Sequence, residues 1–121
     1  AAIDFILETG FDSITRHEIG LTQICLDKLQ SETDVEIYGP TSMESRAGVV
    51  AFNLRGVHPH DVAQVLNESG IAVRAGHHCT QVLHSKLGLQ ASVRLSVGIY
   101  NTEEEILRLV TSLQHVRDLL K

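Results

Sequence analysis

Residues 92–97, with the sequence SVRLSV, alternate strictly between polar and apolar side chains. Successive side chains of a β-strand point to opposite faces, so Val93, Leu95 and Val97 fall on one face. Arg94 falls on the other face, between two serines. We therefore predict a strand here, with one apolar face and one polar face that carries a guanidinium group.

The sequence on both sides of this strand predicts three further strands and about four helices. Downstream, Thr102 and Glu105 form a capping box, and apolar residues at helical spacing continue to Leu120. Upstream, Gly39-Pro40 and Gly70 mark turns between apolar segments. The chain begins with an expected short helical piece over 2–8. The other expected helices cover 13–30, a segment from Pro59 to Gly70, and 82–87. The other expected strands cover 35–38, 48–54 and 71–74.

This order of elements predicts an α/β sandwich, a small and roughly four-stranded sheet with helices packed on one or both faces. The 121 residues fit one domain, and the apolar content of 43% excludes intrinsic disorder. No apolar run approaches the roughly 18 residues of a membrane span. A net charge of −5 gives no reason to expect nucleic acid or anionic lipid as a partner. Two cysteines do not make a disulfide framework, so we expect a reducing compartment, the cytoplasm.

The densest group of reactive side chains is the run 74–79, RAGHHC. A thiol becomes a nucleophile when nearby positive charge or a histidine lowers its pKa. Gly76 allows a backbone turn that projects Cys79 outward. Three neighbours are candidates for activating this thiol: Arg74, His77 and His78. The alternative is an exposed loop whose thiol has no function.

Arg94 is the second candidate, because a guanidinium on a strand can bind a carboxylate through two parallel hydrogen bonds. It follows Cys79 by fifteen residues. By spacing alone, an ordinary solvent-facing arginine is the simpler interpretation.

Zinc is the rival interpretation of the loop. Its potential ligands lie within eight residues: His77, His78, Cys79 and His84. Adjacent His-His-Cys side chains cannot easily all reach one tetrahedral ion, and the chain has no Cys-x-x-Cys pair. We therefore expect no metal site. Cys25 falls on the apolar face of the helix over 13–30, where we expect a buried core residue.

Two segments carry a resemblance to a known family. Residues 56–62, GVHPHDV, and residues 70–79, GIAVRAGHHC, resemble the C-terminal part of pyridoxal-phosphate-dependent cysteine desulfurases. These enzymes form, with the selenocysteine lyases, a branch of the class V aminotransferase superfamily. Arg94 and the segments 38–40, 50–53 and 100–105 are also similar to that family, and the resemblance extends over nearly the whole chain.

The resemblance implies an activity. Family members bind pyridoxal phosphate in a large domain, as a Schiff base to a lysine, and a smaller C-terminal domain closes over the site. Cys79 matches the cysteine that attacks the sulfur of L-cysteine, which leaves a persulfide and releases L-alanine. Arg94 matches the arginine that holds the substrate carboxylate, and Arg74 matches an arginine beside the loop. Three further residues match positions of the site loop without an assigned proton: Gly76, His77 and His78.

The resemblance also implies partners: L-cysteine or L-selenocysteine as substrate, a separate sulfur-acceptor protein as in iron–sulfur cluster assembly, and a second copy in a homodimer of the intact enzyme. The sequence departs from the family in one respect. Its three lysines, Lys28, Lys86 and Lys121, lie in nothing like the cofactor-lysine segment. We therefore expect residues 1–121 to be a single small C-terminal domain, with 1–10 as the tail of an inter-domain helix. We expect this chain alone to bind no pyridoxal phosphate and to be inactive.

Three alternatives remain open from the sequence. The first is a selenocysteine lyase. The second is a free-standing domain that accepts sulfur or binds a partner through the loop. The third is another lyase or aminotransferase of the superfamily, and Cys79 argues against it because such relatives need no cysteine there.

Overall fold

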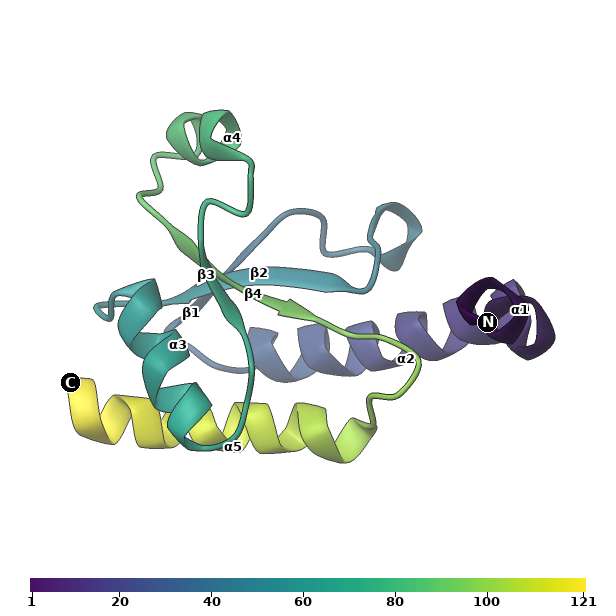
Figure 1. The fold of residues 1–121 in the computed structure, drawn as a ribbon. Helices are drawn as coiled ribbons and strands as arrows, with labels where there is room; N and C mark the ends of the chain where they lie inside the picture. Colours follow the sequence, from purple (N-terminus) through teal and green to yellow (C-terminus); the bar gives the residue numbers. More distant parts are fainter.

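The computed structural model describes residues 1–121, and each expected helix and strand has a counterpart in it (Figure 1). The helices are α1 (Ala2–Thr9), α2 (Phe11–Gln30), α3 (Pro59–Glu68), α4 (Gln81–Lys86) and α5 (Glu103–Leu120). The strands are β1 (Val35–Tyr38), β2 (Val49–Leu54), β3 (Arg74–Gly76) and β4 (Ser92–Ser96), and a short 3₁₀ helix, η1 (Met43–Ser45), was not expected. No helix combines the length and apolar composition needed to cross a bilayer.

The four strands form one antiparallel sheet in the order β1-β2-β4-β3. Helices α2 and α3 pack on one face of this sheet, α5 packs against α2 and α3, and α4 stands on the other side (Figure 1). The predicted α/β architecture is confirmed, with one covered face and one open face. Apolar residues of the strands and of the three packed helices form a single core, which includes Phe52, Val93, Leu26, Leu66 and Leu113.

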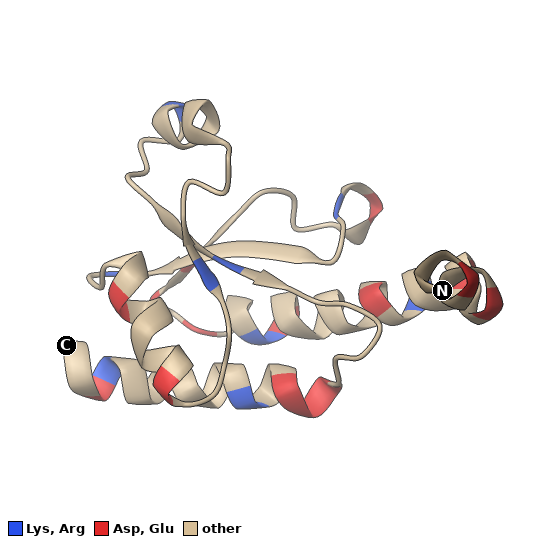
Figure 2. Cartoon of the chain, viewed as in Figure 1, with Lys and Arg blue, Asp and Glu red and all other residues tan.

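The strand register places four side chains in one row across the open face. Tyr38 of β1 is the Cα partner of Ala51 on β2, Ala51 is the partner of Arg94 on β4, and Arg94 is the partner of Arg74 on β3. Residues directly opposite each other in an antiparallel pair share a face of the sheet. Figure 2 shows the resulting pair of basic positions on the neighbouring strands β3 and β4. Two guanidinium groups therefore meet on the side of the sheet that the long helices leave open.

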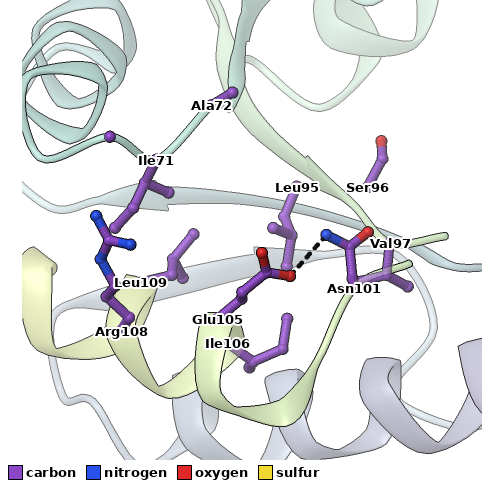
Figure 3. A pocket seen from close by; sticks show the side chains of 11 residues that line it. Ile71, Ala72, Leu95, Ser96, Val97, Asn101, Glu105, Ile106, Arg108 and Leu109 are labelled. Carbon is purple, nitrogen blue, oxygen red and sulfur yellow. Dashed lines mark hydrogen bonds between the residues drawn. The ribbon is translucent and has the colours of Figure 1, made fainter. Parts of the chain in front are cut away.

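The third strand is shorter and later than the sequence predicted. The expected segment was 71–74, whereas β3 starts at Arg74 and pairs only with residues 92–94 of β4. Ile71 and Val73 pack against the core, as their alternation suggested. A cavity of about 250 Å³ separates residues 70–72 from residues 95–97 (Figure 3), so the backbone there has no partner strand. The loop correspondingly starts at His77, because Ala75 and Gly76 belong to β3.

Charged side chains join the end of α5 to the segment between α2 and β1. Arg117 donates to Glu32 at 2.7 Å and to both carboxylate oxygens of Asp34, at 2.8 and 3.0 Å. Lys121 also donates to Asp34. The hydrogen bond from Arg117 is the main reason that the pKa of Asp34 lies well below its ordinary value, although partial burial opposes it.

Candidate active site

A cavity of about 440 Å³ lies between the open face of the sheet and helix α4. Its floor comes from β2 and β4, including Ala51, Ser92 and Arg94, and Tyr38 of β1 contributes one side. Its cover comes from the loop and α4, including His78 and His84. The smaller cavity beside α5 (Figure 3) contains no histidine or cysteine, and its Arg108 donates to the backbone of Ser69 at 2.6 Å. Of the side chains that the sequence singled out, His78, His84 and Arg94 line the first cavity.

Arg94 lines this cavity and is only partly satisfied by the fold. Its side chain is half-buried, and its Nε is buried without a hydrogen-bond partner. A buried guanidinium nitrogen without a partner is costly, and a bound carboxylate is the group that best satisfies it. Arg74, directly opposite on β3, adds positive charge to the same face. The arrangement suits an anionic ligand and does not resemble an ordinary solvent-facing arginine.

Cys79 lies at the tip of a tight turn between β3 and α4. Thr80 N donates to His77 O at 2.8 Å, and the two residues between them, His78 and Cys79, have positive φ values of 53° and 64°. This is the φ pattern of a type I′ turn, which normally requires Asn and Gly. Two non-glycine residues in the left-handed region store strain of the kind found at functional sites. The turn leaves Cys79 exposed, and its thiol makes no hydrogen bond within the chain.

His78 connects this turn to the sheet. Its Nε2 lies 3.0 Å from Ser92 O and 3.1 Å from Ser92 Oγ. A carbonyl oxygen only accepts, so Nε2 carries the proton and Nδ1 is an unprotonated acceptor. Nδ1 is buried and has no hydrogen-bond partner. Burial lowers the pKa of His78, and the positive charge of Arg94 adds to this, although the hydrogen bond to Ser92 opposes it. The ring is therefore neutral at pH 7.

The structure brings most of the predicted site residues together. Arg94 and His78 line one cavity, Arg74 is the register partner of Arg94, and Cys79 follows His78 at the exposed tip. Gly76 ends β3 with a φ of 129°, which only glycine adopts easily. His77 is exposed, and its ring meets the edge of the His84 ring at a centroid distance of 5.4 Å.

Three other residues named in the sequence analysis or found beneath the loop are Cys25, His84 and Ser92. Cys25 is buried in the core, as predicted, and burial raises its pKa to about 12. No three His, Cys, Asp or Glu side chains are grouped so that they could hold a metal ion. Sequence reasoning considered His84 only as a zinc ligand and assigned no role to Ser92. The structure shows both hydrogen-bonded beneath the loop, and no pattern in the sequence indicated that contact.

The chain does not supply a lysine for a Schiff base at this cavity. None of the residues that line it is a lysine. Lys28 lies on α2, on the covered side of the sheet, and Lys86 lies in the last turn of α4. Lys121 pairs with Asp34. The residues present fit a carboxylate site, and they do not fit the covalent attachment of pyridoxal phosphate.

Comparison with known proteins finds matches over most of the chain. The model of the aminotransferase class-V family matches residues 1–109. A cysteine desulfurase of Haloferax volcanii is 46% identical to the chain over 98% of its length. That alignment spans 28% of the relative, so the chain covers a little over a quarter of such proteins.

Solved structures show the same partial match. The apo cysteine desulfurase of Thermococcus onnurineus NA1 superimposes with a TM-score of 0.92 at 37% identity, over 98% of this chain and 29% of that one. The cysteine desulfurase CsdA (S-sulfonic acid) of Escherichia coli superimposes with a TM-score of 0.90 at 27% identity, over 99% of this chain and 29% of that one.

Proposed function

The chain belongs to the class-V aminotransferase family, and from this premise we propose that it is the small C-terminal domain of a cysteine desulfurase. In the proposed reaction L-cysteine yields L-alanine, and its sulfur remains as a persulfide on Cys79. Pyridoxal phosphate in the intact enzyme is part of this proposal, and its lysine would come from outside residues 1–121.

One observation carries the proposal. The guanidinium of Arg94, whose Nε is buried without a hydrogen-bond partner, lies beneath a strained turn whose exposed tip is a cysteine. In the proposed role Arg94 binds the α-carboxylate of the substrate, with Arg74 adding positive charge from the neighbouring strand. Cys79 supplies the nucleophilic sulfur, and Gly76, His77 and His78 shape the loop around it.

The exposure of Cys79 supports a further part of the proposal, the transfer of sulfur to a separate acceptor protein. A persulfide at the tip of a turn is open to attack by the thiol of another protein. The two unpaired cysteines fit a reducing compartment, so the proposed location is the cytoplasm. We also propose that the intact enzyme is a homodimer.

The full-length protein encoded at this locus provides the test. It is purified with pyridoxal phosphate, and alanine and persulfide sulfur are measured after addition of L-cysteine. Cys79→Ala should abolish both products and leave cofactor absorbance unchanged. Cys25→Ala is the matched control. Cys25 is fully buried in the core, so its substitution should leave the amounts of both products unchanged. Alanine formation at the parental rate by Cys79→Ala refutes the assignment of the nucleophile.

The same assay separates the second candidate, a selenocysteine lyase. Exposure of Cys79 favours a role in sulfur chemistry, but selenium is the better leaving group and needs less help from a thiol. A parental protein that releases alanine from L-selenocysteine and not from L-cysteine supports the lyase. If the natural protein lacks a cofactor lysine altogether, persulfide loading of Cys79 from a low-molecular-weight persulfide tests the sulfur-accepting role.

A further inference from the structure

His84 is a buried histidine with both ring nitrogens engaged. Its side chain is 5% exposed, its Nδ1 lies 3.0 Å from Thr80 O, and its Nε2 lies 3.0 Å from Ser92 Oγ. Since a carbonyl oxygen only accepts, Nδ1 carries the ring proton. Nε2 is then an acceptor, and the hydroxyl of Ser92 must be its donor.

This assignment determines the direction of the next hydrogen bond. The single proton of the Ser92 hydroxyl is used by His84, so Ser92 Oγ can act only as an acceptor toward His78 Nε2. The carbonyl of Ser92 is a second acceptor for the same nitrogen. His78 therefore keeps its proton on Nε2, and its Nδ1 stays free.

The hydrogen bonds that join Thr80, His84, Ser92 and His78 also span the turn that carries Cys79. Thr80, the residue after the cysteine, is bound by one nitrogen of His84. His78, the residue before it, is bound through Ser92 to the other nitrogen. The two residues that flank Cys79 in the chain are thus connected by one buried imidazole.

We propose that His84 is a positioning residue that acts through Ser92: it holds the Ser92 hydroxyl as an acceptor and thereby keeps Nδ1 of His78 free to accept a proton next to Cys79 in the chain. The significance of this for sulfur chemistry rests on the proposed function, since Cys79 must release a proton to become a thiolate. The hydrogen-bond arrangement itself does not depend on that function.

The imidazole ¹⁵N spectrum of residues 1–121 tests the inference without cofactor or substrate. Measured at pH 7.5, where His78 is neutral because burial lowers its pKa, the two tautomers should be opposite: Nε2-protonated at His78 and Nδ1-protonated at His84. In His84→Leu the freed Ser92 hydroxyl can donate to His78 Nε2. The Nδ1-protonated form of His78 should then rise about fivefold, the effect of one neutral hydrogen bond.

The double variant His84→Leu with Ser92→Ala sharpens the test. It lacks the competing donor, so the carbonyl of Ser92 should return His78 to the Nε2-protonated tautomer. His17→Leu is the matched control, since His17 bonds to Asn101 O far from the loop and should leave His78 unchanged. If His84→Leu does not fold, His84→Asn replaces it, because it offers an amide donor for Thr80 O but no ring acceptor for Ser92.

Two results overturn the inference: a wild-type His78 with its proton on Nδ1, or an unchanged His78 tautomer in the folded His84 variant. Neither readout involves turnover. A full-length protein that forms no alanine therefore refutes the proposed function alone, and a wrong tautomer refutes this inference alone.

Discussion

Replacing Arg94 by Met separates a binding arginine from a structural one. In the chain without substrate, a buried donor that lacks a partner costs about 1–3 kcal/mol, and the guanidinium of Arg74 directly opposite adds about 0.2–1 kcal/mol of repulsion. Met keeps most of the apolar stem of the side chain. Arg94→Met should therefore stabilise residues 1–121 by about 1 kcal/mol, which raises Tm by about 4 °C in a domain of this size.

Activity of the full-length enzyme should change in the opposite direction. Loss of two charge-assisted hydrogen bonds to a carboxylate removes about 3 kcal/mol, so kcat/KM for L-cysteine should fall about 100-fold. The measurements are a thermal melt followed by circular dichroism and an alanine-release assay. Arg55→Met is the control, because Arg55 is exposed in the turn after β2 and should change neither quantity. A variant that melts several degrees lower with unchanged kcat/KM refutes the reasoning.

Three further outcomes follow from the contacts described above. The depressed pKa of Asp34 means that its ion pair contributes stability above the ordinary carboxyl pKa of about 4, and this contribution is lost as the pH falls further. In urea unfolding, Asp34→Asn should thus lower the free energy of unfolding by about 1–2 kcal/mol at pH 7 and by less at pH 2. A difference between the variant and the parental chain that is the same at both pH values contradicts the ion-pair account. Iodoacetamide at pH 8 should label Cys79 in the folded chain and leave Cys25 unlabelled, because burial raises the pKa of Cys25 to about 12. Mass spectrometry measures the labelling, and equal labelling of both cysteines refutes the burial of Cys25. Thr102→Ala removes the side-chain acceptor at the start of α5 and should cost about 1 kcal/mol in the same unfolding experiment, and no loss argues against the capping box.

The fold was predictable from the sequence where local patterns decide structure. The alternation in 92–97 corresponds to β4 (Ser92–Ser96), and the capping box at Thr102 corresponds to the first turn of α5. The third strand was misplaced because hydrophobic alternation reports burial and not pairing. Ile71 and Val73 are packed without a neighbouring strand, and only the three-dimensional course of β4 determines where pairing begins.

The candidate site was predictable in its residues and not in its connections. The run 74–79 and Arg94 were recognisable from residue types and from the family resemblance. The pairing of Arg74 with Arg94 depends on strand register, and the contact of His84 with Ser92 depends on how α4 stands over the sheet. Sequence separation conceals such contacts, because the residues that meet lie eight to twenty positions apart.

The left-handed backbone at His78 and Cys79 has a consequence for laboratory evolution of this domain. Each of these residues bears a conformational cost of about 1 kcal/mol that Asn or Gly would relieve. A library selected for thermal resistance alone should therefore enrich Asn-Gly at positions 78 and 79, and the winning clones would have discarded the thiol. At positions 78 and 79 the residues that favour thermal stability differ from those that supply the thiol. A screen for more stable variants therefore needs a simultaneous selection for the cysteine.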